Sequence, residues 1–422
     1  MRRVSLAGLA VLGALALAIP AAFAKADTTA ATPGVSATRI VIGGTFPLTG
    51  PASSYAPIPA SMKAYFSYIN ARKGPDGKRG VYGRQIVFKY YDDGYNPVQS
   101  VQLTRKLVQE DKVFAVVGSL GTEVNEAIRP YLNQARVPHV LVSTGATQFS
   151  ARSEAKRYPW TIGWQPDYIA EGRLYGIDIS RNKPNAKIAI LYQNDSYGKD
   201  YVYGFKSALG ATKVRQQVVA EEPYEVTQPS PQSQLVKLRG SGANTLLIFV
   251  TPRPTIQTYA IIRALGWKPT DIYVNSVSAT DTFMSTAVGA SNAATVNGSI
   301  SAAYLKDPAN PTWARDRTVV QYKNLMAKYN PNGRVTDGLN FYGFAKADTF
   351  VRALYKAGRN PTRASLMRAM LSFNDTTGFL LPSVRIKTTA TDRFMISHQQ
   401  MQVYENGTWR LRGRLIDLRP RG

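Results

Sequence analysis

From residue 39 onward, short runs of apolar and β-branched residues alternate with longer segments in which apolar positions recur every three or four residues. The short runs predict buried strands at 39–44, 85–91, 113–118 and 139–142. The longer segments between them predict helices at 58–71, 97–110 and 123–135. Strands that alternate with helices in this way are typical of βαβ units, so we expect a parallel sheet with helices on its faces.

A second series of strands and helices follows a break in this pattern. The segment 144–167 mixes glycine, serine and proline with two tryptophans, and we interpret it as the first crossing between two lobes. The alternation then restarts, with strands expected at 187–192, 214–220, 245–250 and 272–275. The accompanying helices are expected at 197–209, 232–241 and 255–265.

The C-terminal part predicts a strand at 298–304 and helices at 313–329, 339–357 and 364–371. In the tail, 384–418, strands are expected around Asn406-Gly407, because Asn-Gly favours a two-residue hairpin turn. The whole pattern predicts an α/β fold with two doubly wound, Rossmann-like lobes. We assign 38–160 plus 304–384 to the first lobe and 161–303 plus 385–418 to the second. Open α/β sheets bind ligands beyond the carboxyl ends of their strands, so the cleft between the lobes is the expected site.

The first 24 residues have the pattern of an export signal. Arg2 and Arg3 precede an apolar run over 6–19, and Ala22-Phe23-Ala24 matches the small-x-small cleavage pattern. The apolar run is shorter than the roughly 20 residues that a permanent membrane span needs. We therefore expect an exported protein from which 1–24 have been removed.

The composition is that of a globular chain of 422 residues, with 44% hydrophobic and 19% charged residues. It contains no cysteine, which excludes disulfides, thiol nucleophiles and an acylated N-terminal cysteine. A free periplasmic protein is therefore expected rather than a cysteine-anchored lipoprotein. Only His139 and His398 are available for imidazole chemistry, so a three-histidine zinc site is impossible.

The formal net charge of +25 raises the possibility of a partner that is a polyanion. Lysine and arginine are scattered, however, without a block of five or six, a zinc-finger spacing or an aromatic RNP-type strand. We therefore expect no nucleic-acid partner. A basic polyanion-binding exported protein remains an alternative.

Two loops that follow neighbouring predicted strands carry candidate chemistry. The first, 118–122, contains two glycines and runs into a helix, which favours an anion site at the helix N-terminus. Thr122 either caps that helix or binds a ligand carboxylate. The second loop, 143–147, is rich in hydroxyl groups. Adjacent strand ends lie only about 5 Å apart, so both loops are expected to converge on one small polar group. Tyr55 and Tyr197 fall at similar strand ends and face the same cleft.

The motifs for enzymatic chemistry are incomplete. The segment 117–121 approaches a nucleophile elbow, but Val117 stands where the motif has glycine. Phosphate-loop and dinucleotide-binding motifs are absent from the sequence, so we expect no cofactor. Asp92-Asp93 lacks a third ligand at a suitable spacing, so we expect no metal. A secreted hydrolase that uses His139 as a base remains an alternative, although a packed histidine is the commoner role at the start of a buried strand.

Several motifs occur in the order typical of one known family. They are Gly44-Thr45-Phe46-Pro47-Leu48-Thr49-Gly50, Tyr91-Asp92-Asp93 with Pro97, Val117-Gly118, Val137-Pro138 and Asn194-Asp195-Ser196-Tyr197-Gly198. On these residues the chain resembles the leucine/isoleucine/valine-binding branch of the type I periplasmic binding proteins, over about 38–410. The resemblance implies two lobes joined by three crossover strands, and a non-enzymatic solute receptor that works with an ABC permease in the inner membrane.

The resemblance also implies roles for particular residues. Contacts to a ligand carboxylate fall on Thr122, Gly145 and Thr147, and aromatic contacts fall on Tyr55 and Tyr197. Family members that bind amino acids carry an acidic residue after the last strand of the second lobe, whereas this chain has Ser276 in that region and no carboxylate over 273–277. Arg253 stands near the expected position of another aromatic contact and favours an acidic ligand. The candidate ligand-binding residues are Tyr55, Leu120, Gly121, Thr122, Gly145, Ala146, Thr147, Tyr197, Arg253 and Ser276. The expected solute is a small amino acid or a related small carboxylate or amide.

Overall fold

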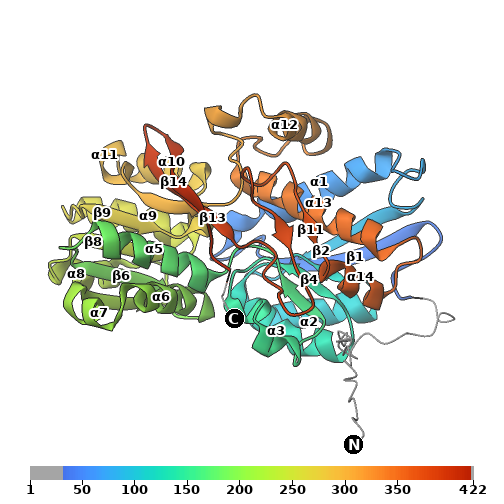
Figure 1. Cartoon of the computed structure of the whole chain (residues 1–422), viewed down its shortest axis with the longest axis horizontal. Coiled ribbons are helices and arrows are strands. Elements are labelled where there is room, and N and C mark those ends of the chain that lie inside the picture. The colour runs from blue at the N-terminus through green and yellow to red at the C-terminus, as the bar shows by residue number, and fades with distance from the viewer. Residues whose placement is uncertain (1–31, 420–422) are drawn as a thin grey trace, which may run out of the picture.

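Two β-sheets, each covered by helices, lie side by side in the computed structural model, which describes residues 32–419 (Figure 1). The predicted leader at 1–24 lies outside the described residues. We call the sheet with order β2-β1-β3-β4-β5 and its helices the first lobe, and the sheet with order β14-β13-β10-β9-β8-β6-β7 and its helices the second lobe. The α/β fold with two doubly wound lobes is thereby confirmed. The exact lobe boundaries drawn from the sequence stay a prediction.

The first lobe has a parallel sheet. Its strands are β1 (Arg39–Phe46), β2 (Gln85–Asp92), β3 (Val116–Val117), β4 (His139–Val142) and β5 (Thr161–Gly163). Its early helices are α1 (Pro57–Ala71), α2 (Pro97–Gln109), α3 (Thr122–Gln134) and the short α4 (Arg152–Ala155). The chain returns to this lobe after the second, adding α12 (Arg317–Tyr329), α13 (Gly338–Ala357), α14 (Arg363–Met370), β11 (Asn374–Asp375) and β12 (Ile386–Lys387). Figure 1 shows α13 packed beside α1.

The second lobe is parallel except at β13, which runs antiparallel to both of its neighbours. The strands are β6 (Ile188–Gln193), β7 (Val218–Tyr224), β8 (Thr245–Phe249), β9 (Asp271–Val274), β10 (Ile300–Ala303), β13 (His398–Glu405) and β14 (Thr408–Asp417). The helices are α5 (Tyr168–Asn182), α6 (Ser196–Leu209), α7 (Ala211–Gln217), α8 (Gln232–Gly240), α9 (Pro252–Ala264), α10 (Asp281–Ala290) and α11 (Ala293–Val296). Short 3-10 turns are η2 (Ser53–Tyr55), η3 (Thr147–Phe149), η4 (Ser276–Ser278) and η5 (Pro311–Trp313).

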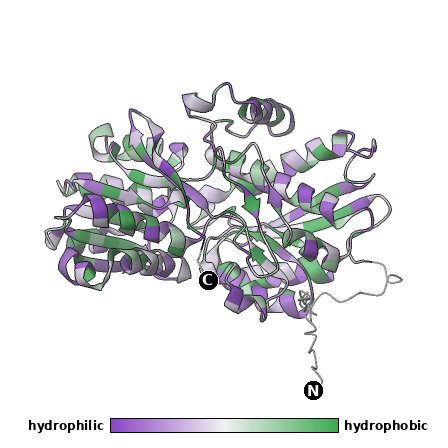
Figure 2. Ribbon diagram, viewed as in Figure 1, coloured by the Kyte–Doolittle hydropathy of each residue, from purple (hydrophilic) through white to green (hydrophobic). Residues whose placement is uncertain are grey.

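The strands of both sheets are buried on two faces, which explains why they read as continuous apolar runs. In β6, Ile188 and Ile190 pack against α5 and α6, whereas Ala189 and Leu191 pack against α8 and α9 on the opposite face. Figure 2 shows hydrophobic residues along the strands of both lobes and hydrophilic residues on the outer helices. Within 32–419, no helix is long and apolar enough to span a membrane.

Two sequence predictions in the second lobe were wrong. The expected strand at 214–220 begins as helix α7, because its first residues include the helix formers Arg215, Gln216 and Gln217, and strand β7 starts only at Val218. Helix α5 was missed, because Gly172 and Gly176 interrupt its apolar pattern.

The structure explains the two glycines of α5 by a close approach of helix α6. A Cβ added at Gly172 would lie 2.3 Å from the carbonyl oxygen of Tyr201, and one added at Gly176 would lie 2.5 Å from that of Phe205. No side chain fits at these distances, so glycine allows the two helices to pack backbone to backbone. The hairpin prediction is confirmed, since Asn406 and Gly407 adopt φ of 51° and 81°, as a two-residue turn between β13 and β14 requires.

Candidate functional site

A cavity lies between the two lobes, where the carboxyl ends of their strands face each other. The free space at this site, including the part that is open to solvent, is about 1000 Å³. Its walls come from the first lobe, from the second lobe and from the segment after β10 that crosses back to the first lobe. Six of the ten candidate residues line it, namely Tyr55, Leu120, Gly121, Thr122, Tyr197 and Ser276.

The first-lobe wall is built by the two loops that the sequence singled out. Gly118 and Gly121 adopt φ of 75° and 114°, a region that other residues rarely occupy, so the loop after β3 depends on glycine to turn into α3. This loop meets the one after β4, since the Oγ1 atoms of Thr122 and Thr144 lie 2.7 Å apart. The Ser143 hydroxyl also donates to the Gly118 carbonyl at 2.7 Å. The structure therefore brings both loops to one polar corner of the cavity.

The geometry at the start of α3 decides whether Thr122 caps this helix or faces the cavity. Gly121 is the N-cap residue of α3, and no side chain caps this helix. Thr122 is instead the first residue of the helix, with only 2% of its surface exposed. Its hydroxyl is thus oriented by Thr144 at the cavity wall rather than used as a helix cap.

The structure does not bring the other four candidate residues to the cavity. A Cβ added to Gly145 would lie 2.2 Å from the Pro166 carbonyl oxygen, so this glycine serves the packing of the segment that leads into α5. Ala146 is buried in the core of the second lobe. Thr147 donates its hydroxyl to Asp167 and its backbone N–H to the Asp200 carboxylate at 2.8 Å. The 3-10 turn η3 begins at Thr147 and turns this side chain towards the second lobe.

Arg253 lies near the start of α9 with an exposed side chain. The residue of this loop that lines the cavity is Thr251, the N-cap residue of α9, which is 4% exposed. Among the described residues its Oγ1 atom has no hydrogen-bond partner, which leaves it available for a solute. Its place after a predicted strand is the one feature of the sequence that pointed to this residue.

Tyrosines dominate the cavity wall. The six that line it are Tyr55, Tyr95, Tyr168, Tyr197, Tyr304 and Tyr342. Burial raises the pKa of each above its ordinary value, so all of them are neutral phenols that can donate a hydrogen bond. The rings of Tyr168 and Tyr197 meet edge to face with centroids 5.0 Å apart. The Tyr55 hydroxyl donates to the Val277 carbonyl at 3.3 Å and so spans the two lobes.

Only two of these tyrosines were predicted as site residues. Tyr95 follows Asp92 and Asp93, whose carboxylates accept hydrogen bonds from the loop itself, with Asp92 receiving the Gly94 amide and Asp93 the Tyr95 amide, both at 3.0 Å. These acids shape the loop that presents Tyr95, and its position at a strand end is a signal that the sequence contained. Tyr342 lies inside a helix, where no local pattern marks it. Within 32–419, no group of three or more histidine or acidic residues is arranged to hold a metal ion.

Ser276 of the second lobe is held by a buried carboxylate. Its backbone N–H donates to Glu171 at 2.7 Å and its hydroxyl donates to the same group at 2.6 Å. The hydrogen of the hydroxyl is therefore committed, and Ser276 is left to accept a hydrogen bond from a solute. The carboxylate that the sequence lacks over 273–277 is thus supplied from helix α5, behind Ser276.

Two further acids near the cavity have perturbed pKa values. Burial raises the pKa of Asp307, which lines the cavity and accepts the Ala309 amide at 2.9 Å, to about 7. Burial likewise raises the pKa of Asp195 to about 7, although this residue accepts hydrogen bonds from Gly198 at 3.1 Å and from Gln193 at 2.6 Å. Asp195 is the N-cap residue of α6, the helix that carries Tyr197.

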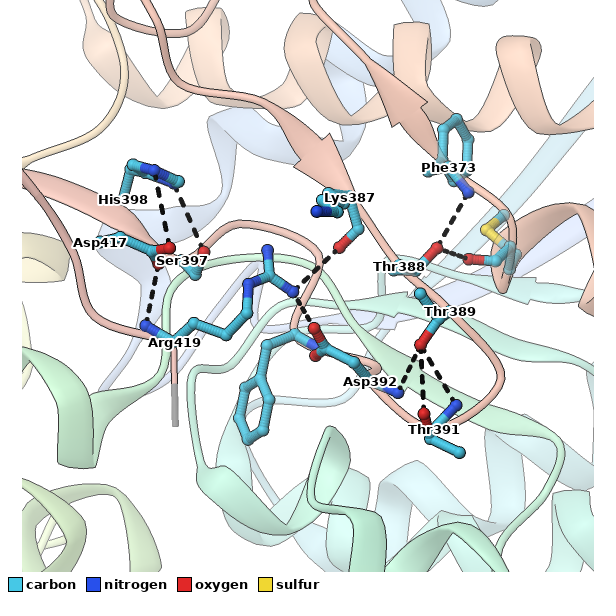
Figure 3. A network of polar contacts seen from close by, with 12 residues as sticks. Phe373, Lys387, Thr388, Thr389, Thr391, Asp392, Ser397, His398, Asp417 and Arg419 are labelled. Carbon is cyan, nitrogen blue, oxygen red and sulfur yellow. Dashed lines mark hydrogen bonds and ion pairs between the residues drawn. The ribbon is translucent and has the colours of Figure 1, made fainter. Parts of the chain in front are cut away.

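Neither histidine lines the cavity. His139 is fully buried in β4, with its Nε2 atom 2.8 Å from Asn125 Oδ1, and burial lowers its pKa to about 3. Figure 3 shows His398 beside Ser397 and Asp417 in the C-terminal tail, and its Nε2 atom is 3.9 Å from the Asp417 carboxylate. In the same view Arg419 contacts Asp392, which ties the residues just after β14 to the segment before β13.

Two lobes with parallel sheets, joined by several crossings and enclosing a cavity between their carboxyl edges, define a two-lobed ligand-binding protein. The model of the periplasmic binding protein family matches residues 39–407, and the chain belongs to this family. The resemblance inferred from the sequence is therefore confirmed, and so is the prediction of a solute-binding receptor. The family implies an extracytoplasmic location. The hydrolase and polyanion-binding alternatives receive no support from the comparisons.

The chain is also similar to individual proteins. A Leu/Ile/Val-binding protein homolog 3 of Brucella melitensis is 26% identical over 213 residues, which are 49% of this chain and about half, 53%, of that relative. The structure of a branched-chain amino acid ABC transporter protein from Thermus thermophilus with bound valine has a TM-score of 0.77 at 16% identity, covering 90% of this chain and 97% of that one.

A solute binding protein of an ABC transporter from Rhodopseudomonas palustris, in complex with 3,4-dihydroxy benzoic acid, has a TM-score of 0.72 at 17% identity. The superposition covers 90% of this chain and 98% of that one. At these identities the structural likeness shows the fold, and the solutes named belong to those proteins.

Proposed function

We propose that this protein is the solute receptor of an ABC importer and that it binds a small carboxylate, amino acid or amide in the cavity between its lobes. One observation carries the proposal: the cavity wall combines Thr122 of the first lobe with Tyr197 and Ser276 of the second. A solute shifts an open-to-closed equilibrium only by its differential affinity for the two states, so contacts from both lobes are what such a receptor requires.

The solute class is supported by the chemistry of the wall and by related proteins. Hydroxyl groups of Thr122, Thr251 and Ser276 offer few but specific polar contacts, and the tyrosines cover the apolar remainder of a small solute. Valine and 3,4-dihydroxy benzoic acid, the solutes named for two related structures, both contain a carboxylate. An ABC permease in the inner membrane is the proposed partner, and a periplasmic location without a lipid anchor is the proposed site of action.

We also propose that the solute leaves the cavity chemically unchanged. The hydrolase alternative assigned the general base to His139, whereas this imidazole is buried, becomes an imidazolium only below about pH 3 because burial lowers its pKa, and does not line the cavity. Ser119, the serine of the incomplete nucleophile motif, receives the Thr45 amide at 3.0 Å in the interior of the first lobe.

The proposal is tested by thermal-shift measurements of the mature chain with amino acids, aromatic acids, amides and small dicarboxylates, followed by calorimetric titration of each solute that stabilises it. Micromolar binding corresponds to about 8 kcal/mol. Removing one charge-assisted hydrogen bond costs about 1.5–3 kcal/mol. Thr122→Val is therefore expected to weaken the binding of a carboxylate roughly 10- to 100-fold.

The matched control is Thr286→Val, the same substitution on the exposed face of α10, which is expected to leave affinity unchanged. The proposal fails if no solute in the panel stabilises the protein. It also fails if a solute is consumed during the titration. Unchanged affinity in Thr122→Val would remove the first-lobe corner from the site.

A further inference from the structure

Lys346 is fully buried in the middle of helix α13, directly behind the cavity wall. Its Nζ atom donates to Ser143 Oγ and to the Gly118 carbonyl oxygen at 3.2 Å, and lies 4.6 Å from the centre of the Tyr342 ring. Ser143 and Tyr342 both line the cavity. The Lys346 Nζ atom is therefore separated from the cavity by a single layer of side chains.

Among residues 32–419, the lysine has neutral acceptors but no counterion. Burial lowers its pKa well below the ordinary value, and no charged neighbour offsets this effect. Asp348, a carboxylate on the same helix, is engaged by Arg352 at 2.7 Å and by the Tyr65 hydroxyl at 2.6 Å. A buried ammonium without an anion is costly, so a negative charge in the adjacent cavity would favour the protonated form of Lys346.

Other buried cations of the described chain are satisfied differently. Lys306 forms an ion pair with Asp316 at 2.6 Å. The Nη1 atom of Arg393 donates to backbone carbonyls, such as that of Thr161 at 3.1 Å, rather than to a carboxylate. Arg393 does not line the cavity. Lys346 thus combines two features, an absent counterion and contact with cavity-lining residues.

The opposite wall shows the reverse situation. The Glu171 carboxylate, which lies behind Ser276, already accepts the two hydrogen bonds of that residue together with those of the Tyr175 hydroxyl at 2.7 Å and the Gln399 amide at 2.8 Å. Four donors satisfy this carboxylate without any cation. The second-lobe wall therefore has no unmet need for a solute ammonium.

We propose that the solute is an organic acid without an α-ammonium group, and that Lys346, acting through Ser143, supplies the positive charge that recognises its carboxylate. This inference rests on the proposed receptor function and narrows the solute class of the same cavity. Lys346 also donates to the Gly118 carbonyl, so the Ser143 hydroxyl can turn from that carbonyl to the solute without leaving the carbonyl unpaired. Asp307 also lines the cavity, so recognition of an ammonium there is the competing result.

The experiment uses matched solutes that differ in one group. 3-Phenylpropionate is compared with 3-phenylpropionamide and phenylalanine, and 4-methylpentanoate with 4-methylpentanamide and leucine, by calorimetric titration of the mature chain. The protein is expected to bind at least one of the two acids 10-fold or more tightly than its amide and its amino acid. In Lys346→Met that acid is expected to lose 10-fold or more in affinity while the amide changes less than 3-fold.

The control is Lys268→Met, which removes the same charge from an exposed position in the second lobe and is expected to keep the preference for the acid. The ratio of acid to amide affinity is the decisive readout, because a lysine with a purely structural role would alter both affinities alike. If Lys346→Met does not fold, Ser143→Ala replaces it, with the same expected loss of the preference.

Three results would overturn the inference. They are an acid-to-amide ratio that survives the substitution, tighter binding of the amino acids than of the acids, and failure of all six solutes to bind. The first two leave the receptor function standing, because a solute still binds. If none of the six solutes binds, the wider thermal-shift panel decides about the receptor function. The receptor function is refuted only if no solute of that panel stabilises the protein.

Discussion

Replacing Thr147 by valine tests whether this residue supports the lobe boundary rather than contacting a solute. Valine keeps the shape of threonine but removes the hydroxyl that donates to Asp167. The backbone N–H that donates to Asp200 at 2.8 Å is retained. The substitution therefore isolates one buried hydrogen bond to an acid that is itself the N-cap residue of helix α5.

The expected cost depends on pH because Asp167 titrates near neutrality. Burial raises its pKa to about 7, and the Thr147 hydroxyl opposes that rise by stabilising the carboxylate. Above this pH the lost bond is one to a charged group, worth about 1.5–3 kcal/mol, whereas below it the bond is between neutral groups and worth about 0.5–1.5 kcal/mol. Thr147→Val should therefore lower the free energy of unfolding by about 2 kcal/mol at pH 8.5 and by about 1 kcal/mol at pH 5.5.

The measurement is denaturant unfolding of both proteins at the two pH values, with the change in midpoint converted through the denaturant slope. Thr286→Val, at an exposed position, is expected to show little change and no dependence on pH. An equal loss at both pH values would show that the hydroxyl does not act on a titrating carboxylate. If stability is unchanged but carboxylate affinity falls, Thr147 is a solute contact after all.

Two further predictions concern neighbouring positions. Gly145→Ala places a Cβ 2.2 Å from the Pro166 carbonyl oxygen and 2.6 Å from the Tyr168 ring. This overpacking is expected to destabilise the protein by about 1–3 kcal/mol and, because it displaces Tyr168, to weaken solute binding. A variant as stable as the parent would contradict this close packing. Asp195, with a pKa raised to about 7, contributes stability that is present below pH 4 and lost as the pH rises through 7. In Asp195→Asn this loss is absent. Between pH 5 and 8 the melting temperature of the variant should therefore fall less than that of the parent, by the equivalent of roughly 1–3 kcal/mol. Parallel curves of melting temperature against pH for the two proteins would refute the assignment.

The periodicity of apolar residues was sufficient to predict most of the fold. Strands buried on both faces, such as β8 (Thr245–Phe249), give unbroken apolar runs that few other structures produce. Helix α5 was not predicted because its glycines allow close packing against α6, and contacts between distant segments leave no periodic pattern in the sequence. The segment 214–217 was misread because short apolar and polar alternation fits a strand and a helix equally well over one turn.

The candidate site was predictable where it depends on strand ends and not where it depends on long-range packing. The loops that contain Thr122 and Ser143 follow neighbouring strands, and the parallel sheet alone brings them together. Gly145 and Thr147 belong to the same loop, but a 3-10 turn directs Thr147 away from the cavity. Tyr342 and Lys346 reach the site from a helix about two hundred residues later in the chain, and no local pattern identifies them.

The contacts between the lobes indicate how a solute can control their closure. Thr147 of the first lobe donates to Asp200 of the second, and burial raises the pKa of Asp200 to about 6 and that of Asp167 to about 7, where the Asp200 charge adds to the rise. Both acids belong to the second lobe, where Asp167 caps α5 and Asp200 lies in α6. The hydrogen bonds from Thr147 stabilise the packed arrangement of the two lobes, and the burial of the two acids opposes it. A solute that contacts both walls adds its differential affinity for the closed state to this balance.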